Sequence, residues 1–396
     1  MKQIARKSWI PRKLNELGFV GRGRSRNRPR NDPTLYGGPY PFIQTADIMA
    51  SDLRVTKYSQ TYSEKGLVQS KLWGENTLCM TIAGENTAET AILSFKACFP
   101  DSIVGFVADP NKADVRFVKY YLDTIKQQLK NVSKGATQDN LSLDKLLSFD
   151  ILTPPVTTQH KIATILSAYD DLIENNTRRI AILEEMAQSL YREWFVHFRF
   201  PGHEKKRLVE SELGLIPEGW EVVKLGDAIE LAYGKALKAD TRMAGDIPVY
   251  GSAGIVGYHY EGLIKGPGII VGRKGNVGSV FWSDTDFFPI DTVFYIRSKV
   301  SLHYIYYNLK AQHFINNDAA VPGLNRNQAY LLPFLLPAGE TLALFQDFVS
   351  PLFDQIKKLT RKNANLRQTH DLLLPKLISG EVDVEGLEID TEAIQV

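Results

Sequence analysis

The chain contains one helical pattern twice, as Ile173-Glu-Asn-Asn-Thr-Arg-Arg-Ile180 and as Ile356-Lys-Lys-Leu-Thr-Arg-Lys-Asn363. A single offset of 183 residues matches the isoleucine, the Thr-Arg pair and the next leucine of the two copies, and it also carries Leu190 onto Leu373. Around both copies the apolar residues recur at alternating steps of three and four, which is the heptad spacing of a coiled coil. The sequence therefore predicts two long helices in a common register.

Each predicted helix carries one asparagine in its apolar seam, Asn176 in the first and Asn363 in the second. A buried asparagine costs stability but fixes the register and orientation of paired helices. We expect antiparallel pairing, because a parallel pair would require the short segment 199–216 to return along a whole helix. The alternative is two ordinary amphipathic helices, each packed on its own globular part. The residues expected in contacts of the coiled coil or with partners are Ile173, Asn176, Ile180, Leu183, Leu190, Ile356, Leu359, Asn363, Leu366 and Leu373. Pro351 is expected either to kink the second helix or to mark its first turn.

Each predicted helix follows a globular part, and the two parts open alike. Trp9 and Leu14 are separated by four residues, and Trp220 and Leu225 repeat this spacing. Short apolar runs between turn residues predict strands. They lie at 78–82, 90–93 and 103–107 in the first part, and at 268–271, 279–282 and 292–296 in the second. Helices are expected at 115–129 and 302–311. The expected fold class is α+β, with two pseudo-symmetric globular domains separated by an antiparallel coiled coil. The expected segments are 1–156 (first globular domain), 157–198 (first long helix), 199–216 (linker), 217–338 (second globular domain), 339–380 (second long helix) and 381–396 (acidic tail).

The composition is that of an ordinary globular protein, with 396 residues, 44% hydrophobic and 23% charged. No apolar run approaches the roughly 20 residues of a membrane span. Cys79 and Cys98 are the only cysteines, which argues against a disulfide framework and favours a cytoplasmic protein. The net charge of +2 hides an uneven distribution of charge along the chain. Residues 21–30 include five arginines and no acidic residue, whereas every charged residue from 381 onward is acidic. Such a basic segment is either a nucleic-acid contact or a solvated stretch of chain.

A catalytic constellation is missing from the sequence. We find no Gly-x-Gly-x-x-Gly dinucleotide fingerprint, no Gly-x4-Gly-Lys-Ser/Thr phosphate loop, and no Asn/Asp-Pro-Pro-Phe/Tyr signature of amino-methyltransferases. The seven histidines are scattered and form no metal-binding pair. We therefore expect no catalytic residue, no metal and no cofactor on this chain.

Side chains suited to contacting DNA are abundant in the predicted turns. Arg273, Lys274 and Asn276 lie in a Gly-rich turn between two strands, and such arginines and lysines pair with guanine or phosphate and asparagines with adenine. The alternative is a hairpin turn without a binding role. Matched polar segments of the first domain align with those of the second, with Asn86 over Asn276. The candidate DNA-binding residues are Arg22, Arg24, Gln44, Thr45, Asn86, Gln138, Asn140, Lys235, Ser252, Arg273, Lys274, Asn276, Asn325 and Arg326.

Taken together, these motifs resemble the specificity subunit of a type I restriction–modification enzyme. The resemblance covers nearly the whole chain and is carried by a combination of individually weak motifs. Besides the paired Trp-x4-Leu openings and the repeated helix, they are Pro41-Phe-Ile-Gln-Thr-Ala-Asp-Ile48, Gly135-Ala-Thr-Gln-Asp-Asn-Leu-Ser142, Gln159-His-Lys-Ile-Ala163, Gly272-Arg-Lys-Gly-Asn-Val-Gly278 and Leu374-Pro-Lys-Leu-Ile-Ser-Gly-Glu381.

The resemblance implies a DNA-reading subunit without catalytic activity of its own. The two globular parts would be target-recognition domains, each reading one half of a bipartite, asymmetric site in double-stranded DNA. The coiled coil would set the spacer and dock two methyltransferase subunits, and two translocase–nuclease subunits would join for cleavage. S-adenosylmethionine, ATP and magnesium would then belong to those partners. Two alternatives remain at this point: a DNA methyltransferase or nuclease in its own right, and a coiled-coil interaction protein that does not bind DNA.

Overall fold

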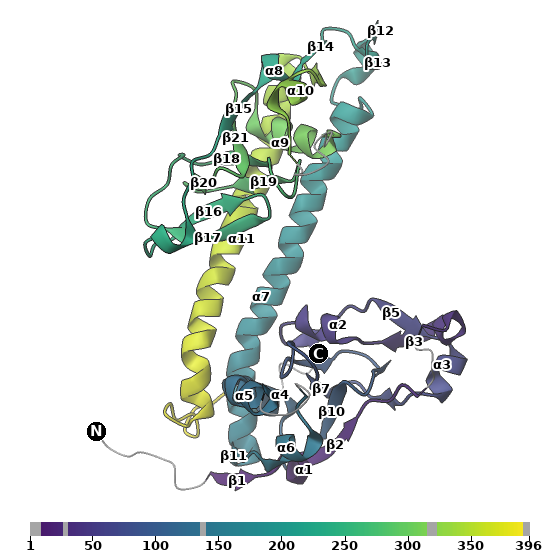
Figure 1. Ribbon diagram of the computed structural model, residues 1–396, viewed down its shortest axis with the longest axis vertical. Coiled ribbons are helices and arrows are strands. Elements are labelled where there is room, and N and C mark those ends of the chain that lie inside the picture. The colour runs from purple at the N-terminus through teal and green to yellow at the C-terminus, as the bar shows by residue number, and fades with distance from the viewer. Residues whose placement is uncertain (1–8, 27–30, 135–139, 315–322, 391–396) are drawn as a thin grey trace. The chain divides into compact units, whose positions relative to one another are not determined.

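The computed structural model describes residues 9–26, 31–134, 140–314 and 323–390 (Figure 1). The chain divides into two compact units, each of which is described by itself. Unit 1 comprises Met1–Asn176 and Lys362–Val396, and unit 2 comprises Thr177–Arg361. The two long helices, α7 (Val156–Tyr191) and α11 (Gly339–Ile378), contribute to both units.

Unit 1 contains three sheets. The first has the order β2 (Gly18–Arg22), β10 (Ile103–Ala108), β7 (Leu78–Thr81), β8 (Thr90–Leu93) and β4 (Arg54–Val55). The second has the order β5 (Gln60–Tyr62), β3 (Tyr36–Phe42), β9 (Ala97–Cys98) and β6 (Leu72–Trp73). The third pairs β1 (Ile10–Arg12) with β11 (Ile151–Thr153) in antiparallel fashion, so the opening of the domain is joined to the strand before α7.

The short helices in the described part of this domain are α1 (Leu14–Leu17), α2 (Thr45–Met49), α3 (Glu64–Val68), α4 (Val115–Thr124), α5 (Lys126–Lys134) and α6 (Leu143–Ser148). The continuous helix expected at 115–129 is interrupted, since Ile125 departs from helical geometry with ψ near 8°. Just before the break, Thr124 Oγ1 donates to the carbonyl of Tyr121 at 2.7 Å. This bond gives the Tyr121 carbonyl a side-chain donor at the point where the regular helical geometry ends.

Unit 2 repeats this architecture with fewer additions. Its main sheet has the order β15 (Glu230–Tyr233), β21 (Val293–Arg297), β18 (Gly268–Gly272) and β19 (Val280–Ser283). A second sheet has the order β17 (Gly254–His259), β16 (Ile247–Gly251) and β20 (Phe288–Pro289), and β14 (Glu221–Lys224) pairs with β22 (Pro333–Leu336). Its short helices are α8 (Leu225–Ala228), α9 (Leu302–Ala311) and α10 (Arg326–Tyr330). The segment expected to be a linker holds a hairpin of β12 (Leu208–Ser211) and β13 (Gly214–Pro217).

The two domains share one topology. In each, the opening strand pairs with the strand that precedes the long helix, and a central hairpin pairs with a third strand. The second sheets agree as well, because β3 pairs antiparallel with β5 and parallel with β9, whereas β16 pairs antiparallel with β17 and parallel with β20. The expected α+β class and the expected duplication are thereby confirmed.

The long helices pair antiparallel within each unit. In unit 1, Asn176 Nδ2 donates to Asn363 Oδ1 at 2.8 Å, and His370 Nε2 lies 3.8 Å from Asp170 Oδ1. In unit 2, the ring of Trp194, in the π-helical turn after α7, lies 5.8 Å from that of Phe345. The residues expected in the seam are all buried or half-buried. Helix α11 continues through Pro351, so this proline does not mark its first turn.

The amide pair in the seam is fully enclosed. Asn176 and Asn363 are 3% and 4% exposed, and Asn363 Nδ2 also donates to the carbonyl of Ile173 at 3.3 Å. A buried amide without a partner costs roughly 1–3 kcal/mol, so each asparagine needs the other. In this alignment of the two helices the two amides bond to each other, which is the arrangement expected of a pair that fixes the register.

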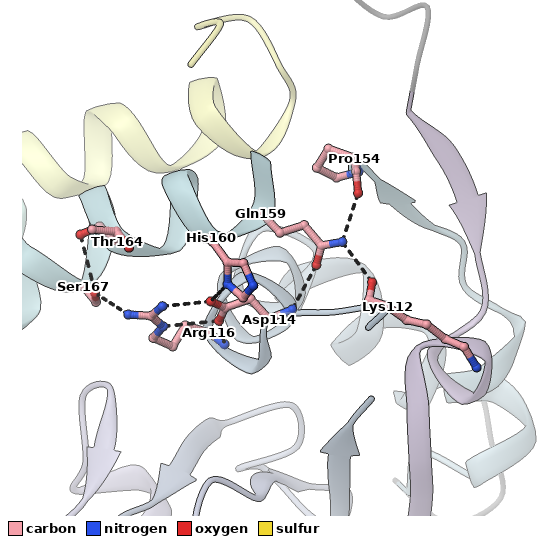
Figure 2. A network of polar contacts seen from close by, with 8 residues as sticks. All are labelled: Lys112, Asp114, Arg116, Pro154, Gln159, His160, Thr164 and Ser167. Atoms are coloured by element: carbon pink, nitrogen blue, oxygen red, sulfur yellow. Dashed lines mark hydrogen bonds and ion pairs between the residues drawn. The ribbon is translucent and has the colours of Figure 1, made fainter. Parts of the chain in front are cut away.

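A polar network joins the first domain to the start of α7 (Figure 2). The fully buried Gln159 accepts from the backbone N–H of Asp114 and donates to the carbonyls of Lys112 and Pro154. Asp114 caps α4 and accepts from Arg116 Nη2 and contacts His160 Nδ1, both at 2.8 Å. Burial alone would raise the pKa of Asp114, but the contacts with His160 and Arg116 outweigh it and lower the pKa to about 2. Gln159 and His160, taken from the motif at 159–163, thus position α7 on the domain.

Replacing one member of the amide pair should be more harmful than replacing both. Asn363→Ala leaves Asn176 buried without its partner, and we expect a loss of about 1–3 kcal/mol in the free energy of unfolding. The double variant Asn176→Leu/Asn363→Leu should recover that stability, since an apolar seam needs no amide partner. Denaturant unfolding measures both effects, with Asn175→Ala on the exposed face of α7 as the control. Equal stability of the Asn363→Ala and control variants would contradict this account.

The network at Asp114 should make stability depend on pH in acid. Its folded pKa is depressed from the ordinary 3.8 to about 2, so its contribution is complete above pH 4 and is lost as the pH falls through about 2. Asp114→Asn should therefore lower the free energy of unfolding at pH 7 by about 2 kcal/mol and flatten its change between pH 4 and pH 2. Urea unfolding at several pH values tests this. The exposed Asp144→Asn is the matched control, and a variant that behaves like it would refute the assignment.

Candidate nucleic-acid interface

A basic residue follows β2 in the first domain and β15 in the second, and its backbone is held in the same way in both. The backbone N–H of Arg24 donates to the carbonyl of Phe99 at 2.9 Å, and that of Lys235 donates to the carbonyl of Pro289 at 3.0 Å. A glycine precedes each basic residue and lies against the facing strand. A Cβ on Gly23 would approach the Phe99 oxygen to 2.3 Å, and one on Gly234 would approach the Pro289 oxygen to 2.5 Å. The two expected basic residues therefore occupy equivalent, sterically fixed positions.

The turn of the central hairpin meets the segment that precedes the last short helix. In unit 1 the turn residue Ala83 forms an antiparallel bridge with Asn140, and in unit 2 Lys274 forms one with Gly323. The turns that contain Asn86 and Asn276 are thus placed beside the segments that carry Asn140 and Asn325. Sequence segments about 50 residues apart are brought together at one corner of each domain.

In unit 2 this corner gathers two arginines around one tyrosine. The guanidinium carbon of Arg273 lies 4.9 Å from the ring centroid of Tyr233, and that of Arg326 lies 4.8 Å from the same centroid. Arg273 Nη1 also donates to the carbonyl of Asp291 at 2.9 Å. Within the described part of the chain, neither guanidinium has a carboxylate partner. Lys274, Asn276 and Lys235 are exposed around the two arginines.

Two of the expected residues in unit 2 have local structural contacts. Asn325 is the N-cap of α10, and its Oδ1 accepts from the backbone N–H groups of Asn327 and Gln328 at 3.0 and 3.2 Å. Ser252 follows β16 and lies beside the hairpin turn, because a Cβ on Gly275 would be 3.2 Å from its Oγ. Both residues therefore border the corner, and Asn325 also anchors the helix that carries Arg326.

In unit 1 the expected residues surround a different feature. Gln44 and Thr45 line a pocket of about 520 Å³ that is also lined by Ser25, Asn31 and Gln60. Gln44 Nε2 donates to Gln60 Oε1 at 2.6 Å. Arg22 is exposed at the end of β2, whereas the guanidinium of Arg24 is engaged by the carbonyl of Ser70. Gln138 lies outside the described residues.

Two aromatic contacts with cations were not predicted from the sequence. Tyr233 was not among the candidate DNA-binding residues, although the 211-residue offset between the Trp-x4-Leu openings aligns it with the candidate Arg22. In unit 1, Lys71 Nζ lies 3.6 Å from the ring centroid of Trp73 and 4.3 Å from that of Phe19. Burial, and then the nearby Arg24, lower the pKa of Lys71. The sequence held no comparable signal for this second cluster.

The side chains gathered at these sites are cationic, amide and aromatic groups. No group of three or more His, Cys, Asp or Glu in the described residues is arranged to hold a metal ion. Cys79 and Cys98 are buried without a disulfide, and burial raises the pKa of both thiols, so neither is an activated nucleophile. No helix within the described ranges is both long and apolar enough to cross a bilayer.

A family model described as the type I restriction modification DNA specificity domain matches residues 6–185 and 217–367. The chain belongs to this family. The type I restriction enzyme MjaIX specificity subunit of Methanocaldococcus jannaschii is 25% identical, over 96% of this chain and 95% of that protein. The HindI specificity subunit of Haemophilus influenzae is 23% identical, over 63% of this chain and 72% of that protein.

A solved structure supports the fold of this family member. The type I restriction–modification S subunit of M. genitalium matches with a TM-score of 0.62 at 17% identity, over 95% of this chain and 98% of that one. The resemblance stated from the sequence is thereby confirmed. As a member of the specificity family, the chain is a DNA-recognition subunit and not a catalytic one.

Proposed function

We propose that each globular domain reads one half of a bipartite DNA site through one corner. The corner is formed by the turn of the central hairpin, by the basic residue that follows β2 or β15, and by the segment before the last short helix. The observation that supports this most strongly is the equivalence of Arg24 and Lys235. Both follow a sterically required glycine and both donate a backbone N–H to matching carbonyls. Two domains that have otherwise diverged thus keep a basic residue at one backbone position, exposed as Lys235 in unit 2 and bonded to the Ser70 carbonyl as Arg24 in unit 1. Basic side chains of this kind neutralise phosphates.

The two corners differ in the side chains that would contact bases. Unit 2 presents Arg273 and Arg326 with Asn276, which suit guanine and adenine edges in the major groove. Unit 1 presents Gln44 and Thr45 at a pocket, Asn86 in the turn after β7, and Arg22 exposed at the end of β2. Different base-contacting groups in two copies of one fold support an asymmetric site. We propose that the paired helices set the number of unread base pairs between its halves.

The partners are proposed to carry the reaction. Two methyltransferase subunits would supply the S-adenosylmethionine site, and two translocase–nuclease subunits would supply the sites for ATP and magnesium. Asn176 and the carbonyl of Ile173 are engaged by Asn363 of α11, so we look for a partner contact among other, exposed apolar residues of α7. Ile182 and Met186, four residues apart on α7, are 50% and 52% exposed and form an apolar pair on one helix face. We propose this pair as a contact for a methyltransferase subunit. The bounds given above for the two domains, the two long helices, the linker and the tail are also part of this proposal.

The proposed reading of DNA is tested by selection from a pool of random duplexes with the full chain and its methyltransferase partner. The native complex should enrich a site with two defined halves, and Arg273→Ala should relax preference in one half by roughly 1–3 kcal/mol per base pair. If Arg273 instead contacts phosphate, the affinity for all sequences should fall alike. The slope of the logarithm of the binding constant against the logarithm of the salt concentration should then become shallower by about one. Arg297→Ala, which removes an exposed arginine already paired with Glu230 at 3.5 Å, is the control. A native complex that enriches no sequence would refute the proposed function.

Docking through α7 is tested separately. Ile182→Asp combined with Met186→Asp places charge on the exposed apolar pair, so the affinity for the methyltransferase subunit should fall at least about 10-fold. Size-exclusion chromatography and titration calorimetry measure this loss. Glu185→Gln, at an exposed neighbouring position, should leave assembly intact. Unchanged assembly of the double variant would exclude this face.

A further inference from the structure

The cluster in unit 2 has an unusual charge arrangement. Arg273 comes from the turn after β18 and Arg326 from the start of α10, yet both guanidinium carbons lie less than 5 Å from the ring centroid of Tyr233. The two cations are therefore less than about 10 Å apart, within the range in which like charges repel appreciably. The tyrosine ring, whose faces attract cations, offsets part of this repulsion.

The ring itself is held by its surroundings. Tyr233 pairs with Phe294 across β15 and β21, and their ring centroids are 5.0 Å apart. Tyr330, 5.9 Å from the Arg326 guanidinium carbon, accepts through its hydroxyl from the backbone N–H of Leu231 at 2.9 Å. Arg326 thus has fixed aromatic groups near it, and its buried Nε has no hydrogen-bond partner within the described residues.

The other cations of the corner are presented differently. Lys235 and Lys274 are exposed, and within the described ranges their ammonium groups have neither a hydrogen-bond nor an ion-pair partner. Exposed ammonium groups suit the phosphate backbone as point charges, whereas an oriented guanidinium fork suits the paired acceptors of one base. The corner therefore separates into two exposed lysines and two arginines that lie over one ring.

We propose that Tyr233 is a specificity-determining positioning residue, which holds Arg273 and Arg326 in the orientations that read guanine in the half-site of the second domain. This inference rests on the proposed function of the corner as a DNA reader. Tyr233 is not required to touch DNA; it acts through the two arginines. In the first domain the equivalent position is Arg22, so the first half-site would be read without an aromatic ring at this position.

The experiment compares Tyr233→Leu, which removes the ring, with Tyr233→Phe, which keeps it. Each full-length variant, assembled with its methyltransferase partner, selects from the random duplex pool. We expect Tyr233→Leu to lower the preference for guanine by roughly 10- to 100-fold per affected base pair in one half-site only. Tyr233→Phe should retain the native preferences, and the salt dependence of binding should stay unchanged in both. The control is Tyr258→Leu, which alters an exposed tyrosine of the same domain that has no guanidinium over its ring among the residues the structure describes.

The outcomes separate the two proposals. If the native complex enriches a bipartite site and Tyr233→Leu enriches the same site with the same preferences, the positioning role fails while the proposed function stands. A loss of affinity that is equal for all sequences would assign the two arginines to phosphates and would also overturn the inference. Because the Tyr233 side chain is 48% exposed, the melting temperature of Tyr233→Leu should remain near the native value, and its measurement detects any failure to fold. In that event Arg326→Lys, which keeps the charge but removes the fork, provides the same readout of guanine preference.

Discussion

The contact between α7 and α11 is the constraint on which both globular domains depend. In unit 1, Ile162 and Leu166 of α7 and Leu377 of α11 belong to the same apolar cluster as the domain residues around Phe117. In unit 2, Tyr191 of α7 and Phe345 of α11 belong to the cluster around Tyr304 and Trp220. The helices are therefore part of each core, and a shift in their register would disturb both domains at once. The buried amide pair Asn176–Asn363 opposes such a shift, since a shift would separate the two buried amides.

Features determined by local periodicity were predictable from the sequence. The heptad pattern identified both long helices, and short apolar runs between turn residues identified the strands of the central hairpins, since both patterns depend on residues close in the chain. The helix at 115–129 was predicted without its break, because the break at Ile125 leaves no trace in an apolar pattern. The hairpin 208–217 was missed because most of its residues are exposed and carry no burial signal.

The candidate site was predictable as a set of segments but not as an arrangement. Turn residues such as Arg273 stood out by their chemistry, and the repeat paired them with counterparts in the first domain. That Arg273 and Arg326 share the ring of Tyr233 depends on strand pairing between distant segments, which one sequence does not specify. The same holds for Gln44, whose place at a pocket depends on β3 and β5 lying side by side. Whether these residues contact bases stays a prediction.

The composition of unit 1 has a consequence for biosynthesis. Its core takes Leu377, Ile378 and Val384 from near the end of the chain, and Gly380 lies against Trp9. Unit 2 is one uninterrupted segment, Thr177–Arg361, and can close while the ribosome is still adding residues. The first domain, although made before unit 2, receives these three apolar residues only after unit 2 has been made. A substitution that disturbs residues 377–384 would therefore also weaken the domain that contains Trp9, and an exchange of that domain between relatives should carry the matching residues of α11 with it.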